Sequence, residues 1–333
     1  MDVEHYVEAA PSAIEFHLVR FWRAWVVVFV FVALAVAGYC IAFLPPSDFP
    51  SGSIVKIVRG TSASEVAAQL TDTRIIAHPR VLRMVLRVSG GSVRVQAGPY
   101  LFNTPENLLV VAYRLMTGDY GIPPARITFP EGETARDAAE RVHNAFPDIS
   151  TSDFISKAQP YEGYLFPDTY LFVPSSDVDS IVKTMRENFD TKTLSFKNDI
   201  TASGHSLSDI VIMASLIERE ARSIGAKRMV AGILWNRLEL GMPLQVDAVF
   251  GYIYGRDTYS PTFDDLKVDS PYNTYIHKGL PPGPISNPGL DSLDAATNPT
   301  KTDYLYYLTG NDGLMHYATT YAGHQANQRK YLR

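Results

Sequence analysis

The sequence predicts an α+β protein with a single N-terminal transmembrane helix. Three observations lead to this prediction. An uncharged run lies near the N-terminus, and strand-like and helix-like segments alternate through the rest of the chain. The composition, with 46% hydrophobic and 20% charged residues, is that of a globular protein. The length of 333 residues suggests about two domains.

Composition excludes several classes of protein. A formal charge of -5, without clustered Lys and Arg, argues against nucleic acid as a partner. The single cysteine, Cys40, excludes an internal disulfide framework and a multi-cysteine zinc site. None of the eight histidines forms an HExxH motif or another close ligand cluster.

The uncharged run extends from Ala24 to Leu44, about the 20 residues that a helix needs to cross a bilayer. Arg20 and Arg23 precede it, and Pro45–Pro46 end it on the other side. Because positive residues favour the cytoplasmic side, we expect residues 1–23 in the cytoplasm and the rest of the chain, from residue 45, outside it.

Three other interpretations of this run remain. A cleaved signal peptide has a shorter apolar core, of about 7 to 15 residues, with small residues before the cut. Lipoprotein processing at Cys40 is disfavoured by the bulky Tyr39 beside it. A buried core helix is disfavoured by the length and position of the run.

Residues 45–122 are expected to form a linker and a small α+β module. Ile54–Val58 alternates like a strand, Gly60 turns the chain, and Ser62 with Glu65 three residues later predicts a capped helix start. The segments that follow read as a helix, a turn, a strand and a helix closed by Gly118, at 81–88, 90–91, 93–102 and 108–116. This order resembles the LysM-like module that precedes the catalytic part of some cell-wall enzymes. An ordinary strand-to-helix turn is the alternative.

Residues 123–333 are expected to form the larger, mixed α+β domain. A second strand-turn-helix unit begins at Ile127, with Gly132 at its turn. Residues 304–319 read as a hairpin with its turn at Gly310–Gly313. The segment 279–289 is so rich in Pro and Gly that we expect it to be rigid, outside the core, and to shape a groove.

The aromatic stretch Tyr161–Phe172 carries Glu162 and Asp168 between large rings. Aromatic faces with spaced carboxylates suit a sugar, whose apolar faces stack and whose hydroxyls need acceptors. A buried loop and strand would have the same composition.

Glu218 is the strongest candidate for chemistry. The preceding helix, capped at Ser206 or Ser208, has no polar face from Ile210 to Ile217 and must be surrounded by protein. Apolar surroundings disfavour the ionised form of a carboxyl, which can then donate a proton near neutral pH. Glu220 points about 200° away on the same helix. The alternative for Glu218 is a surface ion pair with Arg222, four residues on.

The next helix is expected to be amphipathic. It contains Met229, Ile233 and Leu238 at helical spacing and ends at Gly241.

Five segments occur in an order that identifies a family: Glu162–Tyr170, Ala214–Glu220, Trp235–Leu238 with Gly241–Asp247, Pro271–Tyr275 and Gly279–Pro288. The chain resembles the MltG (YceG-like) endolytic murein transglycosylases over the span, the LysM-like module and all of the remainder. Departures are Val246, Ala248 and Val249 where the family has a small residue and Pro-Thr around the aspartate, and Tyr161 where an aliphatic residue is common.

The resemblance implies an enzyme of the bacterial plasma membrane that cleaves the β-1,4 bond between N-acetylmuramic acid and N-acetylglucosamine within nascent glycan strands. It leaves 1,6-anhydromuramyl ends and needs no cofactor. The family's catalytic glutamate matches Glu218, which would protonate the leaving oxygen and then help the sugar's 6-hydroxyl to attack.

By the same resemblance, five residues are implied to line the glycan groove: Glu162, Gln245, Asp247, Tyr272 and Asn273. Asn and Asp near Pro or Gly often only hold turns, so a structural role is the alternative for each.

Two other functions remain open. One is a catalytically silent scaffold that binds peptidoglycan beside the cell-wall synthesis machinery, and the other is a lysozyme-like muramidase. Penicillin-binding proteins or glycan polymerases are partners that the family implies.

Overall fold

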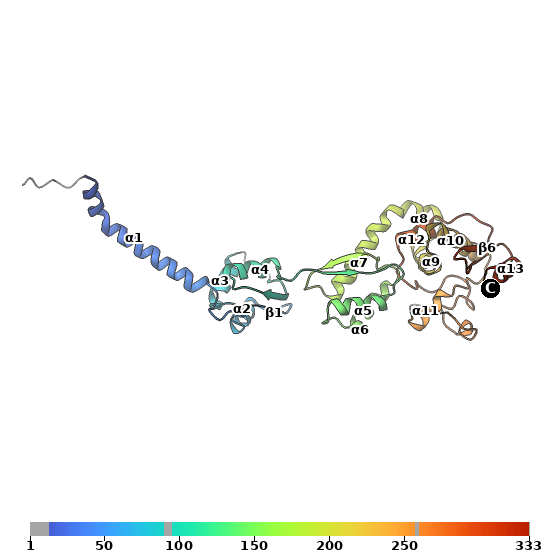
Figure 1. Cartoon of the computed structure of the whole chain (residues 1–333), viewed down its shortest axis with the longest axis horizontal. Coiled ribbons are helices and arrows are strands. Elements are labelled where there is room, and N and C mark those ends of the chain that lie inside the picture. The colour runs from blue at the N-terminus through green and yellow to red at the C-terminus, as the bar shows by residue number, and fades with distance from the viewer. Residues whose placement is uncertain (1–12, 90–94, 257–259, 333) are drawn as a thin grey trace, which may run out of the picture. The chain divides into compact units, whose positions relative to one another are not determined.

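The computed structural model describes residues 13–89, 95–256 and 260–332. The chain divides into two compact units at Pro123–Pro124, coloured blue to blue-green and green to red in Figure 1. We describe each unit by itself.

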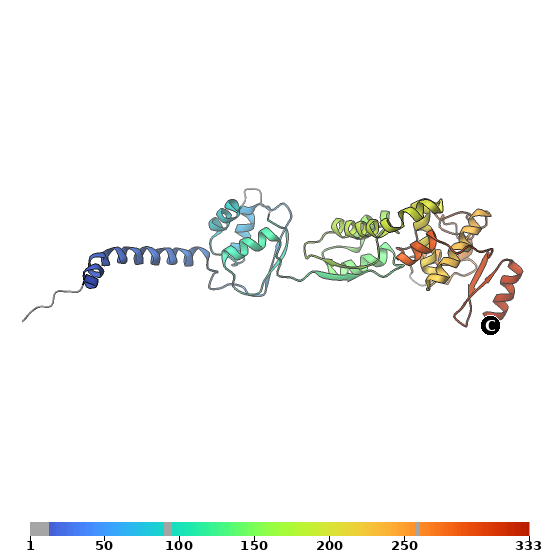
Figure 2. The same cartoon turned by 90° about the horizontal axis from the view of Figure 1, so that it is seen from above.

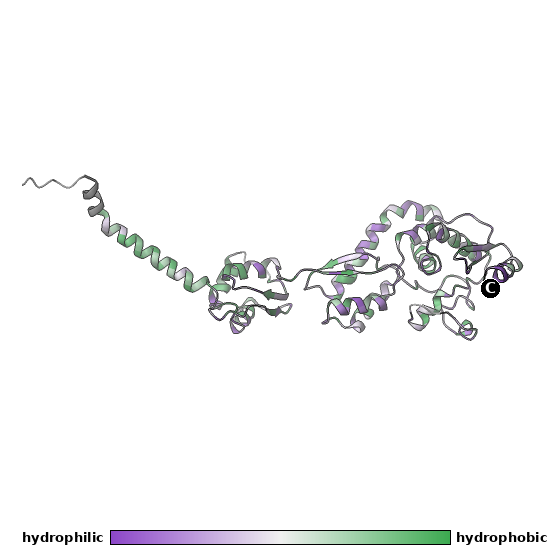
Figure 3. Ribbon diagram, in the orientation of Figure 1, coloured by the Kyte–Doolittle hydropathy of each residue, from purple (hydrophilic) through white to green (hydrophobic). Residues whose placement is uncertain are grey.

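The first unit begins with helix α1, Ala13–Phe43. Its segment Ala24–Phe43 is long and apolar enough to cross a membrane, and Figure 3 shows the hydrophobic colour along it. None of the most apolar part of this segment is buried against protein. A signal sequence would have the same properties, so length and composition make this segment a candidate span only.

A small α+β module follows: β1 Ser53–Ile57, α2 Ala63–Asp72, α3 Pro79–Val88, β2 Gly98–Phe102 and α4 Leu108–Thr117. The strands pair antiparallel, with Val55 opposite Tyr100. The predicted order of elements is confirmed, as are the Ser62 capping box and the left-handed Gly118 that ends α4. The second strand is shorter than predicted, because the Gln96 amide donates to Leu115 of α4 instead of to a strand. The turn predicted at Gly90–Gly91 and residues 93 and 94 of the predicted strand lie outside the described residues.

The second unit opens with β3 Ala125–Thr128, α5 Ala135–Ala145, α6 Thr151–Ala158, the 3-10 turn η1 Gln159–Tyr161, β4 Thr169–Phe172 and α7 Val178–Thr193. The two strands pair antiparallel, and Thr134 caps α5 in a second capping box. The rings of Phe166, Tyr170 and Phe172 are buried. Most of the aromatic stretch therefore forms a buried loop and strand, which was the alternative to a sugar-binding surface. Its start is the exception.

A mostly helical part completes the second unit (Figures 1 and 2). Its elements are η2 Leu194–Phe196, α8 Lys197–Ser203, α9 Leu207–Glu220, α10 Ile224–Glu239, α11 Ala248–Tyr254, η3 Asp265–Lys267, α12 Leu290–Thr297, β5 Tyr306–Thr309, β6 Met315–Ala318 and α13 Tyr321–Tyr331. Helices α9, α10 and α12 pack on one another around the main core. The hairpin prediction is confirmed, with α13 packed beside β5 and β6.

Helix α9 is enclosed as predicted, since every residue from Ile210 to Ile217 is buried and Ser206 caps its start. The prediction of an amphipathic α10 is wrong. Most of its circumference is buried, including Lys227 and Arg237, because α9 and α12 both pack against it.

The expectation that the Pro/Gly-rich segment 279–289 stays out of the core is also wrong. Ile285 and Ser286 are fully buried. The reason is that Ser215 of α9 satisfies their polar groups: its hydroxyl accepts from the Ile285 amide, and its carbonyl accepts from the Ser286 hydroxyl.

Close packing of α10 against the chain after α12 makes Gly232 sensitive to substitution. A Cβ at Gly232 would lie 2.1 Å from the carbonyl oxygen of Thr300, whereas a Cβ at Gly225 on the same helix would meet nothing within 4 Å. We expect Gly232→Ala to destabilise the protein by about 1–3 kcal/mol. Gly225→Ala should be neutral or stabilising by up to about 1 kcal/mol. Urea unfolding of both variants measures this, and equal effects would contradict the close approach.

Candidate active site

Glu218 lies in the last turn of α9 with its side chain only 8% exposed. Three donors converge on its carboxyl group. The Lys227 ammonium lies 2.8 Å from Oε1, while the Ser292 hydroxyl and the Gly289 amide donate to Oε2 over 2.7 and 3.0 Å. Both oxygens are therefore fixed in position.

Local structure explains how these donors meet. The chain becomes extended at Ala221, Ser223 caps α10, and Lys227 follows in the first turns of that helix. Gly289 and Ser292 stand at the start of α12, where helix amides carry partial positive charge. Helices α10 and α12 thus place one ammonium, one hydroxyl and one amide around a single carboxyl on α9.

The apolar surroundings expected for Glu218 are therefore wrong for the carboxyl group itself. Apolar residues surround the helix before it, but the carboxyl contacts a buried ammonium, because α10 and α12 present polar groups at this point. The alternative of an exposed pair with Arg222 is not observed either, since the partner is Lys227.

A second carboxyl group, that of Glu131, lies beside Glu218. A Cβ at Gly289 would lie 1.9 Å from Glu131 Oε1, and the same glycine donates its amide to Glu218. With ordinary backbone dimensions, these contacts place the two carboxyl oxygens within about 7.5 Å of each other. Partial burial, and then the negative charge of Glu218, raise the pKa of Glu131.

Asn287 holds the loop of Glu131 against Glu218. Its backbone pairs with Gly132 and Glu133, and its side-chain amide donates to Glu133 and Glu162. Its side-chain oxygen accepts from the amides of Gly163 and Leu165. This buried asparagine therefore joins three segments that are far apart in the sequence.

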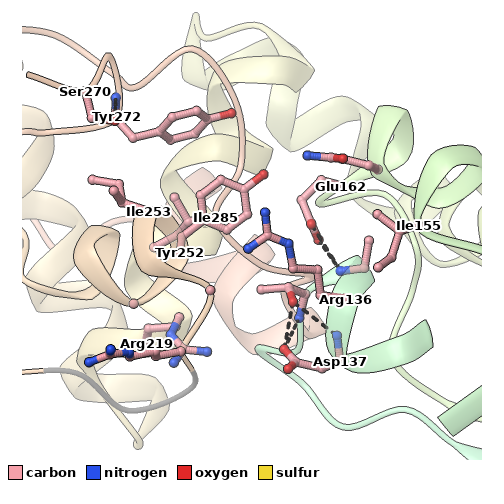
Figure 4. Close-up of a pocket in the computed structure, with 16 residues that line it drawn as sticks. Arg136, Asp137, Ile155, Glu162, Arg219, Tyr252, Ile253, Ser270, Tyr272 and Ile285 are labelled. Carbon is pink, nitrogen blue, oxygen red and sulfur yellow. Dashed lines mark hydrogen bonds between the residues drawn. The ribbon is translucent and has the colours of Figure 1, made fainter. Parts of the chain in front are cut away.

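Glu162 and Tyr272, both predicted for the groove, line one pocket of about 250 Å³ (Figure 4). Glu162 is buried and accepts from the Ala135 amide and from Asn287. Burial raises the pKa of Glu162 to about 7, against the lowering effect of these hydrogen bonds. Tyr272 packs against Tyr252, with ring centroids 5.0 Å apart.

The other three predicted groove residues are not in the lining of this pocket. Gln245 is exposed, with a left-handed φ of 52°, and its backbone amide donates to the Thr274 carbonyl. Asp247 is also exposed and accepts from the Tyr275 hydroxyl. Asn273 has no exposed surface, and its side-chain amide donates to the carbonyls of Leu266 and Val268. Asn273 thus holds a turn here, and roles of all three in binding stay predictions.

Glu220 makes contacts different from those of Glu218, as its direction on the helix predicts. It accepts from the Tyr307 hydroxyl over 3.1 Å. Burial raises the pKa of Glu220 to about 7, and the nearby charge of Asp247 acts in the same direction. Among the described residues, no group of three or more His, Cys, Asp or Glu side chains is arranged to hold a metal ion.

The raised pKa of Glu162 predicts a pH-dependent stability. Its folded value of about 7 exceeds the ordinary value of 4.5, so the folded protein retains a proton that the unfolded chain releases. Stability should therefore fall as the pH rises from about 4.5 to 7, by up to about 3 kcal/mol from this residue. In Glu162→Gln that contribution disappears.

Urea unfolding of wild type and Glu162→Gln at pH 5 and pH 8 checks this prediction. Comparing two pH values within each variant cancels the constant cost of the new amide, and Glu220 contributes equally to both proteins. An identical pH dependence in the two proteins would contradict it.

The fold and site define an α+β protein whose candidate centre is a nearly enclosed carboxyl group. Comparison with known families agrees with this class. The YceG-like family matches residues 55–330, and the chain belongs to that family.

Individual relatives extend the comparison. The chain is 32% identical to the endolytic murein transglycosylase of Bacillus subtilis (strain 168), over 84% of each chain. It is 27% identical to the endolytic murein transglycosylase of Streptococcus pneumoniae serotype 2 (strain D39), over 93% of this chain and 65% of that one. A crystal structure of a yceG-like protein from Listeria monocytogenes is 28% identical, with a TM-score of 0.56, covering 83% of this chain and 99% of the other.

Proposed function

We propose that this protein is a membrane-anchored, endolytic peptidoglycan lytic transglycosylase with Glu218 as its catalytic acid and base. The observation that carries the proposal is the nearly enclosed Glu218 carboxyl with its three donors, in a chain related to proteins named endolytic murein transglycosylases. The bond cleaved joins N-acetylmuramic acid to N-acetylglucosamine within nascent strands, and the product carries a 1,6-anhydro end.

The contacts of Glu218 suit this reaction. Its protonated carboxyl donates to the glycosidic oxygen, the bond from that oxygen to the anomeric carbon breaks, and a carboxylate remains. Lys227, Ser292 and the Gly289 amide stabilise this carboxylate as it forms. The carboxylate then accepts the proton of the sugar's 6-hydroxyl, whose oxygen bonds to the anomeric carbon. Glu218 ends protonated, and no water is consumed.

In this proposal α1 anchors the protein with its N-terminus in the cytoplasm, so the small module that follows α1 and the second unit face nascent peptidoglycan outside it. Support comes from the candidate span Ala24–Phe43, from Arg20 and Arg23 before it, and from the substrate in the relatives' names. The first unit would act as the LysM-like module. Penicillin-binding proteins or glycan polymerases are proposed partners.

A muramidase is the second candidate, because Glu131 supplies a second carboxyl group near Glu218. In a hydrolase that group would hold an attacking water, and carboxyl separations of about 6.5–9.5 Å leave room for one. A non-catalytic scaffold is the third candidate.

Product mass separates the three candidates. The full chain in detergent micelles, beside its Glu218→Gln variant, is incubated with uncrosslinked glycan strands, and soluble products are weighed by mass spectrometry. We expect anhydro-ended fragments from wild type alone. Products heavier by one water would indicate a muramidase, and the absence of soluble fragments from both proteins would favour the scaffold.

A further inference from the structure

We propose that the pocket lined by Arg136, Glu162, Tyr252 and Tyr272 is a subsite for the peptide stem of the glycan, with Arg136 binding a stem carboxylate. This inference rests on the proposed function, because it names the part of a peptidoglycan substrate that this pocket takes.

The pocket has both polar and apolar lining residues and contains an arginine that is available to a ligand. Three arginines from different segments line it: Arg136, Arg219 and Arg256. Among the described residues, no hydrogen bond or ion pair joins the Arg136 guanidinium to another side chain or to the backbone. Figure 4 shows Arg136 extending between Tyr252 and Glu162. An arginine in this setting favours an anion, and above all a planar carboxylate.

Arg136 is positioned by its surroundings. A Cβ at Gly255 would lie 2.4 Å from Arg136 Nη1, so the guanidinium rests against the backbone at the end of α11. A side chain at position 255 would displace the guanidinium from this place, and the left-handed φ of 64° favours glycine there.

The acidic groups of the pocket do not cancel its positive charge. Asp137 accepts from the backbone and hydroxyl of Thr134 in the capping box of α5. Glu162 accepts from Ala135 and Asn287. Their oxygens are thus directed to internal donors, whereas the Arg136 guanidinium faces the pocket.

The pocket adjoins the proposed catalytic group. Arg219 follows Glu218 directly, lines the pocket and donates to the Gly132 carbonyl. A Cβ at Gly132 would lie 3.4 Å from Glu218 Cγ. Glu218 therefore lies next to the pocket lining, and the proposal places a substituent of the glycan unit held at Glu218 in this pocket.

Size and chemistry indicate which substituent fits. A volume of about 250 Å³ is below the ~300 Å³ at which pockets for whole small molecules begin, so the pocket suits one branch of a larger ligand. The peptide stem on the lactyl group of muramic acid is such a branch, and it bears carboxylates. The Tyr252–Tyr272 pair supplies an apolar face for its side chains.

The test compares two substrates with the full chain in detergent: glycan strands whose stems end in free carboxylates, and the same strands after an amidase has removed the stems. We expect Arg136→Ala to raise KM for stem-bearing strands by about 10- to 100-fold, with little change in KM for stem-free strands. For stem-bearing strands, the KM of Arg136→Lys should lie between the KM of wild type and that of Arg136→Ala, because lysine keeps the charge and loses the planar geometry. Arg126→Ala, an exposed arginine on β3, is the matched control and should change neither KM.

The outcomes separate this inference from the proposed function. Equal effects of Arg136→Ala on both substrates, or none, would overturn the stem subsite while leaving the cleavage intact. A larger increase in KM for stem-free strands would show that Arg136 binds the free lactyl carboxylate, and this result would also overturn the stem subsite. If wild type cleaves neither substrate, the proposed function fails, and equilibrium binding of the two kinds of strand to wild type and Arg136→Ala still decides the subsite.

Discussion

Replacing Glu218 by glutamine should reduce kcat for glycan cleavage by about 10²- to 10⁴-fold, the contribution typical of a positioned acid and base. Glutamine keeps the shape of the side chain and can still accept a hydrogen bond from Lys227, but it cannot transfer a proton. Because its amide also places donors against donors at Gly289 or Lys227, some loss of stability is expected as well. Initial rates at saturating glycan measure the effect on kcat.

Glu220→Gln is the matched control, since it is the same change two residues away on α9. Its carboxyl accepts from Tyr307 and lies in another direction, so we expect its kcat to stay within a few-fold of wild type. Unfolding of both variants, followed by the fluorescence of the buried Trp235, shows whether lost activity reflects lost structure. If Glu220→Gln abolishes cleavage while Glu218→Gln retains it, Glu218 is not the acid.

Local sequence signals predicted the elements of this fold well. Capping at Ser62 and Ser206, the stop at Gly118 and the final hairpin depend on residues a few positions apart, and all are confirmed. The enclosed α9 followed from the absence of a polar face, and this pattern also directed attention to Glu218.

The surroundings of Glu218 could not be predicted in the same way, because they come from distant segments. Gly289 and Ser292 lie more than 70 residues further along the chain, and Glu131 lies more than 80 residues before it. The buried position of segment 279–289 depended on Ser215 of α9, whose partners no local rule indicates. Lys227 was closer, but a lysine in a helix is ordinarily expected at the surface. Of the predicted groove residues, Glu162 and Tyr272 share a pocket only because α11 and the loop after it lie beside the start of α5.

The second large effect concerns the ion pair between Lys227 and Glu218, whose side chains are 4% and 8% exposed. Lys227→Met should destabilise the second unit by about 3–5 kcal/mol, because it leaves a buried carboxyl without its cation. An exposed lysine gives the matched control: Lys183 pairs with Glu187 on α7 at the surface, and Lys183→Met should cost less than about 1 kcal/mol. Urea unfolding followed by Trp235 fluorescence measures both.

Combining the two substitutions tests whether the cost comes from the lost partner rather than from a poorly packed methionine. In Lys227→Met with Glu218→Gln neither charge of this pair remains, so the double variant should be more stable than Lys227→Met alone, with a coupling of about 1–3 kcal/mol. Simple additivity of the two single changes would show that Lys227 and Glu218 are not energetically paired. Lys227 would then have no part in holding the carboxylate that forms when Glu218 gives up its proton, and its role as a positioning residue would have to be abandoned.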